Sequence, residues 1–73
     1  MTYLDLAVTD VSDLRPLSAA KSLRELTIDD TFVTDVRPLA GLSGLKRLFA
    51  RETDISDWSP LNALRKNGLS IIV

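Results

Sequence analysis

Residues 23–39 read LRELTIDDTFVTDVRPL, and the same order of residue types occurs twice more in this 73-residue chain. Residues 1–17 read MTYLDLAVTDVSDLRPL, and residues 45–61 read LKRLFARETDISDWSPL. The starts of these stretches are 22 residues apart, which indicates a tandem repeat in which each unit packs against its neighbours. The predicted units of this single domain, 1–73, are residues 1–22, 23–44 and 45–68, followed by a partial strand at 69–73.

The aligned units place apolar side chains in matching columns. Each unit contains a short segment in which inward apolar residues alternate with other residues, which is typical of a strand with one buried face. We expect short parallel strands in which Leu4, Leu26 and Leu48 form one buried row. Further inward columns are expected at Leu6, Ile28 and Ala50, at Val11, Val33 and Ile55, at Leu14, Val36 and Trp58, and at Leu17, Leu39 and Leu61.

The length of the period identifies the kind of repeat. A full βαβ crossover needs about 30 residues, whereas leucine-rich repeats occupy about 20–29. The pattern Leu-x-x-Leu-x-Leu-x-x-Thr-x-Val resembles the leucine-rich template, with Thr where Asn or Cys is usual. It is similar to the repeats of bacterial internalins and of the regulatory subunit of protein phosphatase 1, and similar arrays occur in bacterial signalling NTPases. The resemblance implies an α/β solenoid of about three coils, with a parallel β-sheet on the concave face and short helical turns on the convex face.

Polar side chains are expected to stabilise the turns of this solenoid. Ser12, Thr34 and Ser56 are suitable N-caps for the helical turns, and the Asp after each one favours the positive end of the helix dipole. A repeated Thr follows each strand, and we expect its hydroxyl to bond backbone groups of neighbouring coils. These threonines are Thr9, Thr31 and Thr53.

Outward side chains of neighbouring strands should form a continuous surface, because strands in a sheet are about 4.8 Å apart. The expected columns are Tyr3, Glu25 and Arg47, with Ile71 beyond; Asp5, Thr27 and Phe49, with Val73 beyond; and Ala7, Asp29 and Arg51. This surface carries two aromatic side chains and changes from acidic to basic along the solenoid, which suits a protein partner. The candidate binding residues are Tyr3, Asp5, Glu25, Thr27, Asp29, Arg47, Phe49 and Arg51.

Two other interpretations of these polar residues remain open. The pairs Glu25 with Arg47 and Asp29 with Arg51 could be cross-strand ion pairs that only keep the strands soluble and in register. The repeated Asp13, Asp35 and Asp57 could line a calcium site, but the spacing of calcium-binding nonapeptide repeats is absent and capping explains the row better.

Composition narrows the classes of function. The chain has no Cys and no His, and it shows no phosphate loop, nucleophile–base pair or metal-ligand cluster. We therefore expect no enzymatic activity, no cofactor and no metal. The net charge is −1, with 9 basic and 10 acidic residues, so no partner among nucleic acids or membranes is expected. No signal peptide opens the chain, which favours the cytoplasm.

The function predicted from these features is binding of a protein partner through the concave sheet. An alternative is a structural or oligomerisation segment of a larger leucine-rich repeat protein, and another is a sensing segment of a bacterial signalling NTPase. The apolar stretch from Leu69 to Val73 would form an uncovered strand edge. Either the chain is part of a longer repeat protein, or, if Met1 and Val73 are its true ends, it is expected to self-associate through that edge.

Overall fold

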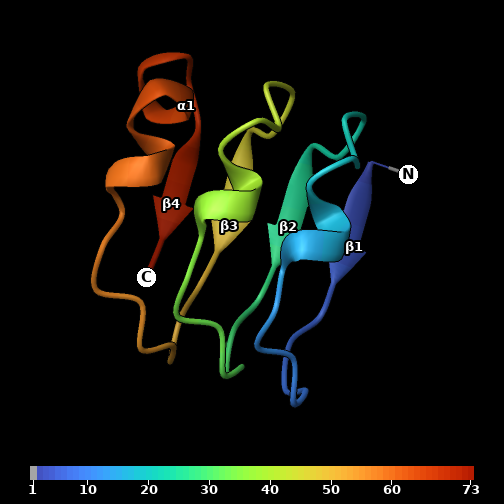
Figure 1. The fold of residues 1–73 in the computed structure, drawn as a ribbon, viewed down its shortest axis with the longest axis vertical. Helices are drawn as coiled ribbons and strands as arrows, with labels where there is room; N and C mark the ends of the chain where they lie inside the picture. The colour runs from blue at the N-terminus through green and yellow to red at the C-terminus, as the bar shows by residue number, and fades with distance from the viewer. Residues whose placement is uncertain (1) are drawn as a thin grey trace.

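Four short parallel strands form one sheet in the order β1-β2-β3-β4 (Figure 1). The computed structural model describes residues 2–73, and Met1, the first residue of the first predicted unit, lies outside that range. The strands are β1 (Tyr3–Asp5), β2 (Glu25–Thr27), β3 (Arg47–Phe49) and β4 (Ser70–Ile72). Strands that neighbour one another in the sheet also follow one another in the chain, which is the arrangement of a solenoid.

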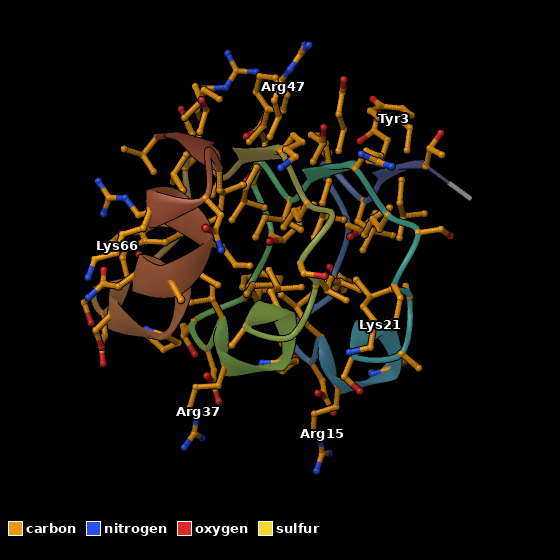
Figure 2. All side chains as sticks on the ribbon, turned by 90° about the horizontal axis from the view of Figure 1, so that it is seen from above. Tyr3, Arg15, Lys21, Arg37, Arg47 and Lys66 are labelled. Carbon is orange, nitrogen blue, oxygen red and sulfur yellow. The ribbon has the colours of Figure 1, made fainter. Side chains whose placement is uncertain are left out.

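Short helical turns cover the inner face of this sheet, on the side away from the exposed strand surface (Figure 2). They are the 3-10 helices η1 (Arg15–Leu17), η2 (Arg37–Leu39) and η3 (Ser59–Leu61), and the α-helix α1 (Asn62–Lys66). Each 3-10 helix carries its proline in the first turn, where the missing N–H leaves no bond unmade. The predicted architecture, a parallel sheet backed by short helical turns, is confirmed.

The strand register confirms the buried row that the repeat predicts. Leu4 pairs with Leu26, and Leu26 pairs with Leu48. Leu26 and Leu48 are fully buried, whereas Leu4, on the first strand, is partly buried against the core. Residues 22 apart therefore occupy the same position on successive coils from β1 to β3.

The register changes between β3 and β4, and the expectation for this step is wrong. Extending the outward columns to Ile71 and Val73 assumes a step of 24 residues, but Arg47 pairs with Ser70 and Leu48 pairs with Ile71, a step of 23. Leu69 is buried, as Leu45 is in the preceding coil. However, β4 begins one residue after Leu69, whereas β3 begins two residues after Leu45. As a result Ile71 faces the core, and Ser70 and Ile72 lie on the concave columns.

One apolar core runs through all the coils between the sheet and the helical turns. The inward columns predicted from the repeat all contribute to it, either as buried residues or as partly buried residues packed against them. The columns are most deeply buried in the second coil, because this coil has a neighbour on both sides. Trp58 lies in its predicted core column but stays partly exposed. The fully buried side chains are Leu14, Leu23, Leu26, Ile28, Leu39, Leu42, Leu45, Leu48, Leu61, Val33 and Val36.

The polar side chains that stabilise the turns are only partly those expected, since the aspartate row caps the turns and the residues before it do not. The N-cap residues of the three described 3-10 helices are Leu14, Val36 and Trp58, and these helices have no capping bond from Ser12, Thr34 or Ser56, so the capping role expected for those residues is wrong. The adjacent aspartates act instead: the Asp35 carboxylate accepts a hydrogen bond from the backbone N–H of Arg37 at 2.9 Å. Asp13 and Asp57 accept the equivalent bonds in their coils. A carboxylate reaches the N–H two residues ahead, which is an Asx turn.

The repeated threonines form hydrogen bonds within their own coils. The hydroxyl of Thr31 donates to the carbonyl oxygen of Ile28 at 2.8 Å, and Thr9 and Thr53 make the same bond to the residue three positions earlier. The prediction that these hydroxyls bond neighbouring coils is therefore wrong. Each threonine closes the turn at the end of its own strand.

Candidate functional site

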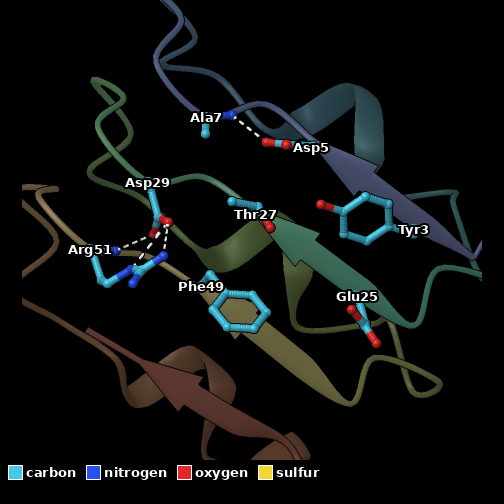
Figure 3. Close-up of a pocket in the computed structure, with 8 residues that line it drawn as sticks. All are labelled: Tyr3, Asp5, Ala7, Glu25, Thr27, Asp29, Phe49 and Arg51. Carbon is cyan, nitrogen blue, oxygen red and sulfur yellow. Dashed lines mark hydrogen bonds and ion pairs between the residues drawn. The ribbon is translucent and has the colours of Figure 1, made fainter.

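A shallow groove of about 650 Å³ lies over the outer face of the sheet (Figure 3). Its walls come from strands β1, β2 and β3 and from the residues that directly follow them. The lining includes every predicted binding residue except Arg47, and it adds Ala7 from the third predicted column. The lining residues are Tyr3, Asp5, Ala7, Glu25, Thr27, Asp29, Phe49 and Arg51. We call this surface the concave groove.

The alternation of the strands explains why these side chains meet. Each strand turns its central residue toward the core, so the two flanking residues point outward, and the register aligns them with those of the next strand. Tyr3 thus lies beside Glu25, and Thr27 lies between Asp5 and Phe49. The structure brings together the predicted columns over the first three strands.

An ion pair between Asp29 and Arg51 closes one end of the concave groove. The Arg51 guanidinium donates to the Asp29 carboxylate at 2.8 Å and 3.2 Å, and the Arg51 backbone N–H donates to the same carboxylate at 2.7 Å. The hydrogen bonds from Arg51 hold the pKa of Asp29 below its usual value, and the carboxylate in turn raises the pKa of Arg51. Both groups are therefore charged at neutral pH.

A second cross-strand pair lies at the other end of the strands. A guanidinium nitrogen of Arg47 is 3.5 Å from a carboxylate oxygen of Glu25. The Arg47 side chain is 59% exposed and projects away from the sheet, as Figure 2 shows, which explains why it does not line the groove. Both ion pairs that the interpretation as surface stabilisation requires are thus present. The longer Glu25–Arg47 pair is the more exposed of the two and can exchange partners at small cost, whereas the Asp29 side chain is only 16% exposed and is held by Arg51.

The two aromatic residues differ in exposure. Tyr3 is 53% exposed and projects outward from β1. Phe49 is half-buried, so of the two aromatic residues expected on the outward surface, Tyr3 is exposed and Phe49 is largely covered. The Arg51 guanidinium carbon lies 6.0 Å from the centre of the Phe49 ring, at the outer limit of a cation–π contact. Phe49 therefore forms part of the floor of the concave groove.

Asp5 is the acidic group of the concave groove that has no cationic partner. Its carboxylate accepts a hydrogen bond from the backbone N–H of Ala7 at 2.9 Å, and the ion pairs formed within residues 2–73 do not include it. Glu25 and Asp29, by contrast, are each paired with an arginine on β3 or just after it. The side of the groove formed by β1 is therefore acidic and the side formed by β3 is basic.

The chemistry available in the concave groove is that of recognition. It offers carboxylate acceptors, a guanidinium, a phenol and an aromatic ring. Over the part of the chain that the structure describes, no three acidic residues gather into a group that could hold a metal ion. Over the same residues, no helix is long and apolar enough to cross a membrane.

Comparison with solved structures identifies the architecture. The chain is similar to internalin C2 from Listeria monocytogenes strain 4b F2365, with a TM-score of 0.79 and 37% sequence identity. The match covers 85% of this chain. The chain is an internalin-like leucine-rich repeat solenoid. No protein-family model matches the sequence, and the comparison with curated proteins gives no match.

This leucine-rich repeat chain spans only part of the length of the solved internalin. The match covers 27% of that chain. Because leucine-rich repeats stack as nearly independent units, a short array can reproduce the local geometry of a longer one. The similarity therefore concerns the geometry of the individual coils and of the sheet that they form.

Two exposed apolar residues of the leucine-rich repeat chain lie outside the predicted site. Phe32 is 66% exposed and Val8 is 76% exposed, and both follow a strand. The equivalent positions in the other coils hold only acidic residues. An apolar residue at a position that is otherwise acidic is the feature of the sequence that could have identified Phe32 and Val8. Those acidic counterparts are Asp10 and Asp54 for Phe32, and Asp30 and Glu52 for Val8.

Proposed function

We propose that this leucine-rich repeat chain is a protein-binding module that holds its partner in the concave groove. Solenoids of this kind present extended concave surfaces, and such surfaces are the ones that repeat proteins use for binding. The observation that carries the proposal is the gathering of Tyr3, Asp5, Phe49 and Arg51 around one depression of about 650 Å³. Aromatic and arginine side chains are the commonest anchors of protein interfaces.

The charge distribution in the concave groove indicates which residue types a partner should carry. The unpaired carboxylate of Asp5 suits a lysine or arginine of the partner, and the exposed ring of Tyr3 supplies apolar area beside it. On the opposite side Arg51 is already held by Asp29, so it contributes shape and a fixed charge more than a free donor. A partner segment with a basic residue next to an apolar residue fits this arrangement.

The proposal can be tested by selecting ligands and then blocking the concave groove. A random peptide library displayed on phage is selected against the wild-type chain, and the selected peptides are synthesised and titrated. Thr27→Arg places a bulky side chain in the middle of the groove, and Arg37→Ala is the matched control on the opposite face. We expect Thr27→Arg to weaken binding at least about tenfold, which is about 1.4 kcal/mol, and Arg37→Ala to leave it unchanged.

The outcome that contradicts the proposal is equally direct. Peptides that bind the wild type and Thr27→Arg with the same Kd would place the binding surface elsewhere. Circular dichroism and thermal melting of each variant show whether the fold is intact. A role as the sensing segment of a signalling NTPase would use the same groove, so the same titrations apply to it.

A structural role is the second candidate, and the apolar character of β4 supports it. Strand β4 pairs with β3 alone within the described residues, and Val73 after it is 74% exposed. An apolar strand with unpaired backbone groups is a template for another strand. If this edge associates, sedimentation velocity detects dimers that increase with concentration, and Ile72→Lys restores the monomer. A monomer at every concentration would contradict this role.

A further inference from the structure

Phe32 is an aromatic side chain in a position that the other coils fill with carboxylates. It is 66% exposed, and it belongs neither to the core nor to the partly buried residues packed against the core. Its backbone N–H donates to the carbonyl oxygen of Val11 at 2.9 Å, which ties its loop to the loop of the preceding coil. The position is therefore defined by the fold, whereas the side chain contributes almost nothing to the core. An exposed phenylalanine held in this way is a suitable anchor for a partner.

Val8 lies on the loop beside it and is both exposed and strained. Its φ is 56°, in the left-handed region that a β-branched residue rarely adopts, and its side chain is 76% exposed. The equivalent residues, Asp30 and Glu52, have φ values of 54° and 59°. The backbone N–H of Val8 donates to the carbonyl oxygen of Asp29 at 2.9 Å, so the strained turn is fixed to the next coil. Valine gains no burial here to offset the strain.

The loops that carry Phe32 and Val8 contain acidic residues and no basic ones. These loops, residues 8–10, 30–32 and 52–54, follow the strands and lie side by side along the lower edge in Figure 1; we call them the strand-end edge. Their carboxylates are in none of the ion pairs among residues 2–73. The acidic residues are Asp10, Asp30, Glu52 and Asp54.

The basic residues that form no ion pair lie on the opposite edge. The segments before the strands, residues 18–24, 40–46 and 62–69, contain no acidic residue. Four arginines elsewhere are paired with carboxylates, and two lysines of these segments bond only carbonyl oxygens. The charge is thus separated across the solenoid although the net charge is only −1. The basic residues concerned are Lys21, Arg24, Lys46, Arg65 and Lys66.

We infer that the strand-end edge is a second docking surface, which binds a basic segment of another protein and seats an apolar side chain of that segment on Phe32. The carboxylates attract and orient the basic residues, and the exposed ring removes apolar area of the partner from water. The surface is distinct from the concave groove, because neither Phe32 nor Val8 lines it. A partner that spans both surfaces would gain from the two sites together.

A second copy of the chain fits this surface less well than a foreign segment. Its basic edge would match the charge of the strand-end edge. Within residues 2–73, however, the exposed large apolar side chains are Tyr3, Val8, Phe32 and Val73, and none of them belongs to the basic edge. That edge therefore offers Phe32 no apolar counterpart. The inferred occupant is a segment that carries basic and apolar residues together.

Two synthetic peptides test the inference with the full chain. Both contain the same number of lysines, and these are separated by leucines in one peptide and by serines in the other. We expect the wild type to bind the leucine peptide about tenfold more tightly than the serine peptide. Phe32→Ser should remove this preference and leave the affinity for the serine peptide unchanged. Because Asp10 and Asp54 occupy the same position in other coils, a polar residue there is compatible with the fold.

Matched variants separate the two docking surfaces. The concave groove also suits a segment with basic and apolar residues, so the titrations are repeated in the Thr27→Arg background, where the groove is blocked. The preference for the leucine peptide should persist in that background, and Asp54→Asn should weaken the binding of both peptides by a few-fold. If Phe32→Ser does not fold, Val8→Asn takes its place and should reduce the preference. The inference is overturned if the preference is lost in Thr27→Arg alone or survives Phe32→Ser in the Thr27→Arg background. Sedimentation that shows self-association in the wild type and none in Phe32→Ser would assign the edge to a second copy and also overturn it.

Discussion

The carboxylate of Asp29 accepts one hydrogen bond from the backbone of Arg51 and two from its guanidinium. The two residues are 22 apart, so this contact joins the second and third coils just beyond the end of the strand ladder. In the first coil the equivalent residue is Ala7, which has no carboxylate to make such a contact. Asp29 thus adds a polar connection between coils at the rim of the concave groove.

The first prediction concerns the pH dependence that this contact produces. The pKa of Asp29 is below its ordinary value of 3.8 in the folded chain. The stabilisation is therefore fully present above that value and is lost as the pH falls through the lower, folded pKa. We expect Asp29→Asn to lower the Tm by about 5 °C near neutral pH, and the difference from wild type to shrink below about pH 4.

Thermal melts across this pH range check the prediction. The lowered pKa values of Asp13, Asp35 and Asp57 mean that the variant also loses stability in acid, but less steeply than the wild type. Asp5→Asn is the matched control, because its carboxylate bonds only the N–H of Ala7 in its own coil. If the Tm difference between wild type and Asp29→Asn stays constant down to about pH 3, the contact is not the source of the effect.

The second prediction compares the first and the middle residue of the buried leucine row. Leu26 is fully buried between two strands, so Leu26→Ala should lower the free energy of unfolding by about 3 kcal/mol. Leu4 is partly exposed and has one neighbouring strand, so Leu4→Ala should lower it by about half as much. Urea denaturation measures both values. Equal losses would show that the first coil is as tightly packed as the second.

The leucine row and the concave columns could be predicted because they depend on a constant period. From β1 to β3 the chain advances 22 residues per coil, so alignment of the sequence is equivalent to alignment in space. The residues of the concave groove follow from the same rule. Arg47 is the exception, since its long side chain turns away from the sheet.

The register of β4 could not be predicted because the period changes within the last coil. The helix α1 replaces the loop that returns the first two coils to their next strand, and Gly68 follows it with a φ of 107°, which suits glycine. Matching Leu69 to Leu45 found the correct buried position. It did not show that the strand begins one residue earlier relative to that leucine. A buried apolar residue fixes an environment but not a strand register.

The sequence could not show which of two adjacent polar side chains forms each local hydrogen bond, for a related reason. Ser, Thr and Asp can all cap a turn, and the choice between adjacent Thr34 and Asp35 depends on which oxygen reaches the N–H of Arg37. The left-handed residues Val8, Asp30 and Glu52 show a similar limit. Aspartate tolerates that conformation, but valine gives no sign of it.

The third prediction follows from the corrected capping role. Asp35→Ala should lower the Tm by about 5 °C, because it leaves the N–H of Arg37 without its acceptor and removes the ion pair with the guanidinium. Thr34→Ala should change the Tm by no more than about 1 °C. The two melts are compared at neutral pH, where the lowered pKa of Asp35 keeps its carboxylate charged. A larger effect from Thr34→Ala would restore the threonine as the cap.

The fourth prediction concerns the strain at Val8. Val8→Asn should raise the free energy of unfolding by about 1 kcal/mol, because asparagine tolerates a φ of 56° and the valine side chain is exposed and buries little. Val8→Gly should raise it less, since glycine loses more entropy on folding. The reverse change at the equivalent site, Asp30→Val, should lower it by a similar amount.

Urea denaturation of these three variants gives the stability, and titration with the leucine peptide gives the function. If Val8 is retained for docking at the strand-end edge, Val8→Asn will be more stable than the wild type and will bind that peptide more weakly. This opposition between stability and binding is expected where a strained residue serves recognition. A variant that gains stability and keeps full affinity would separate the strain at Val8 from any docking role, and one that loses stability would show that the valine is not strained.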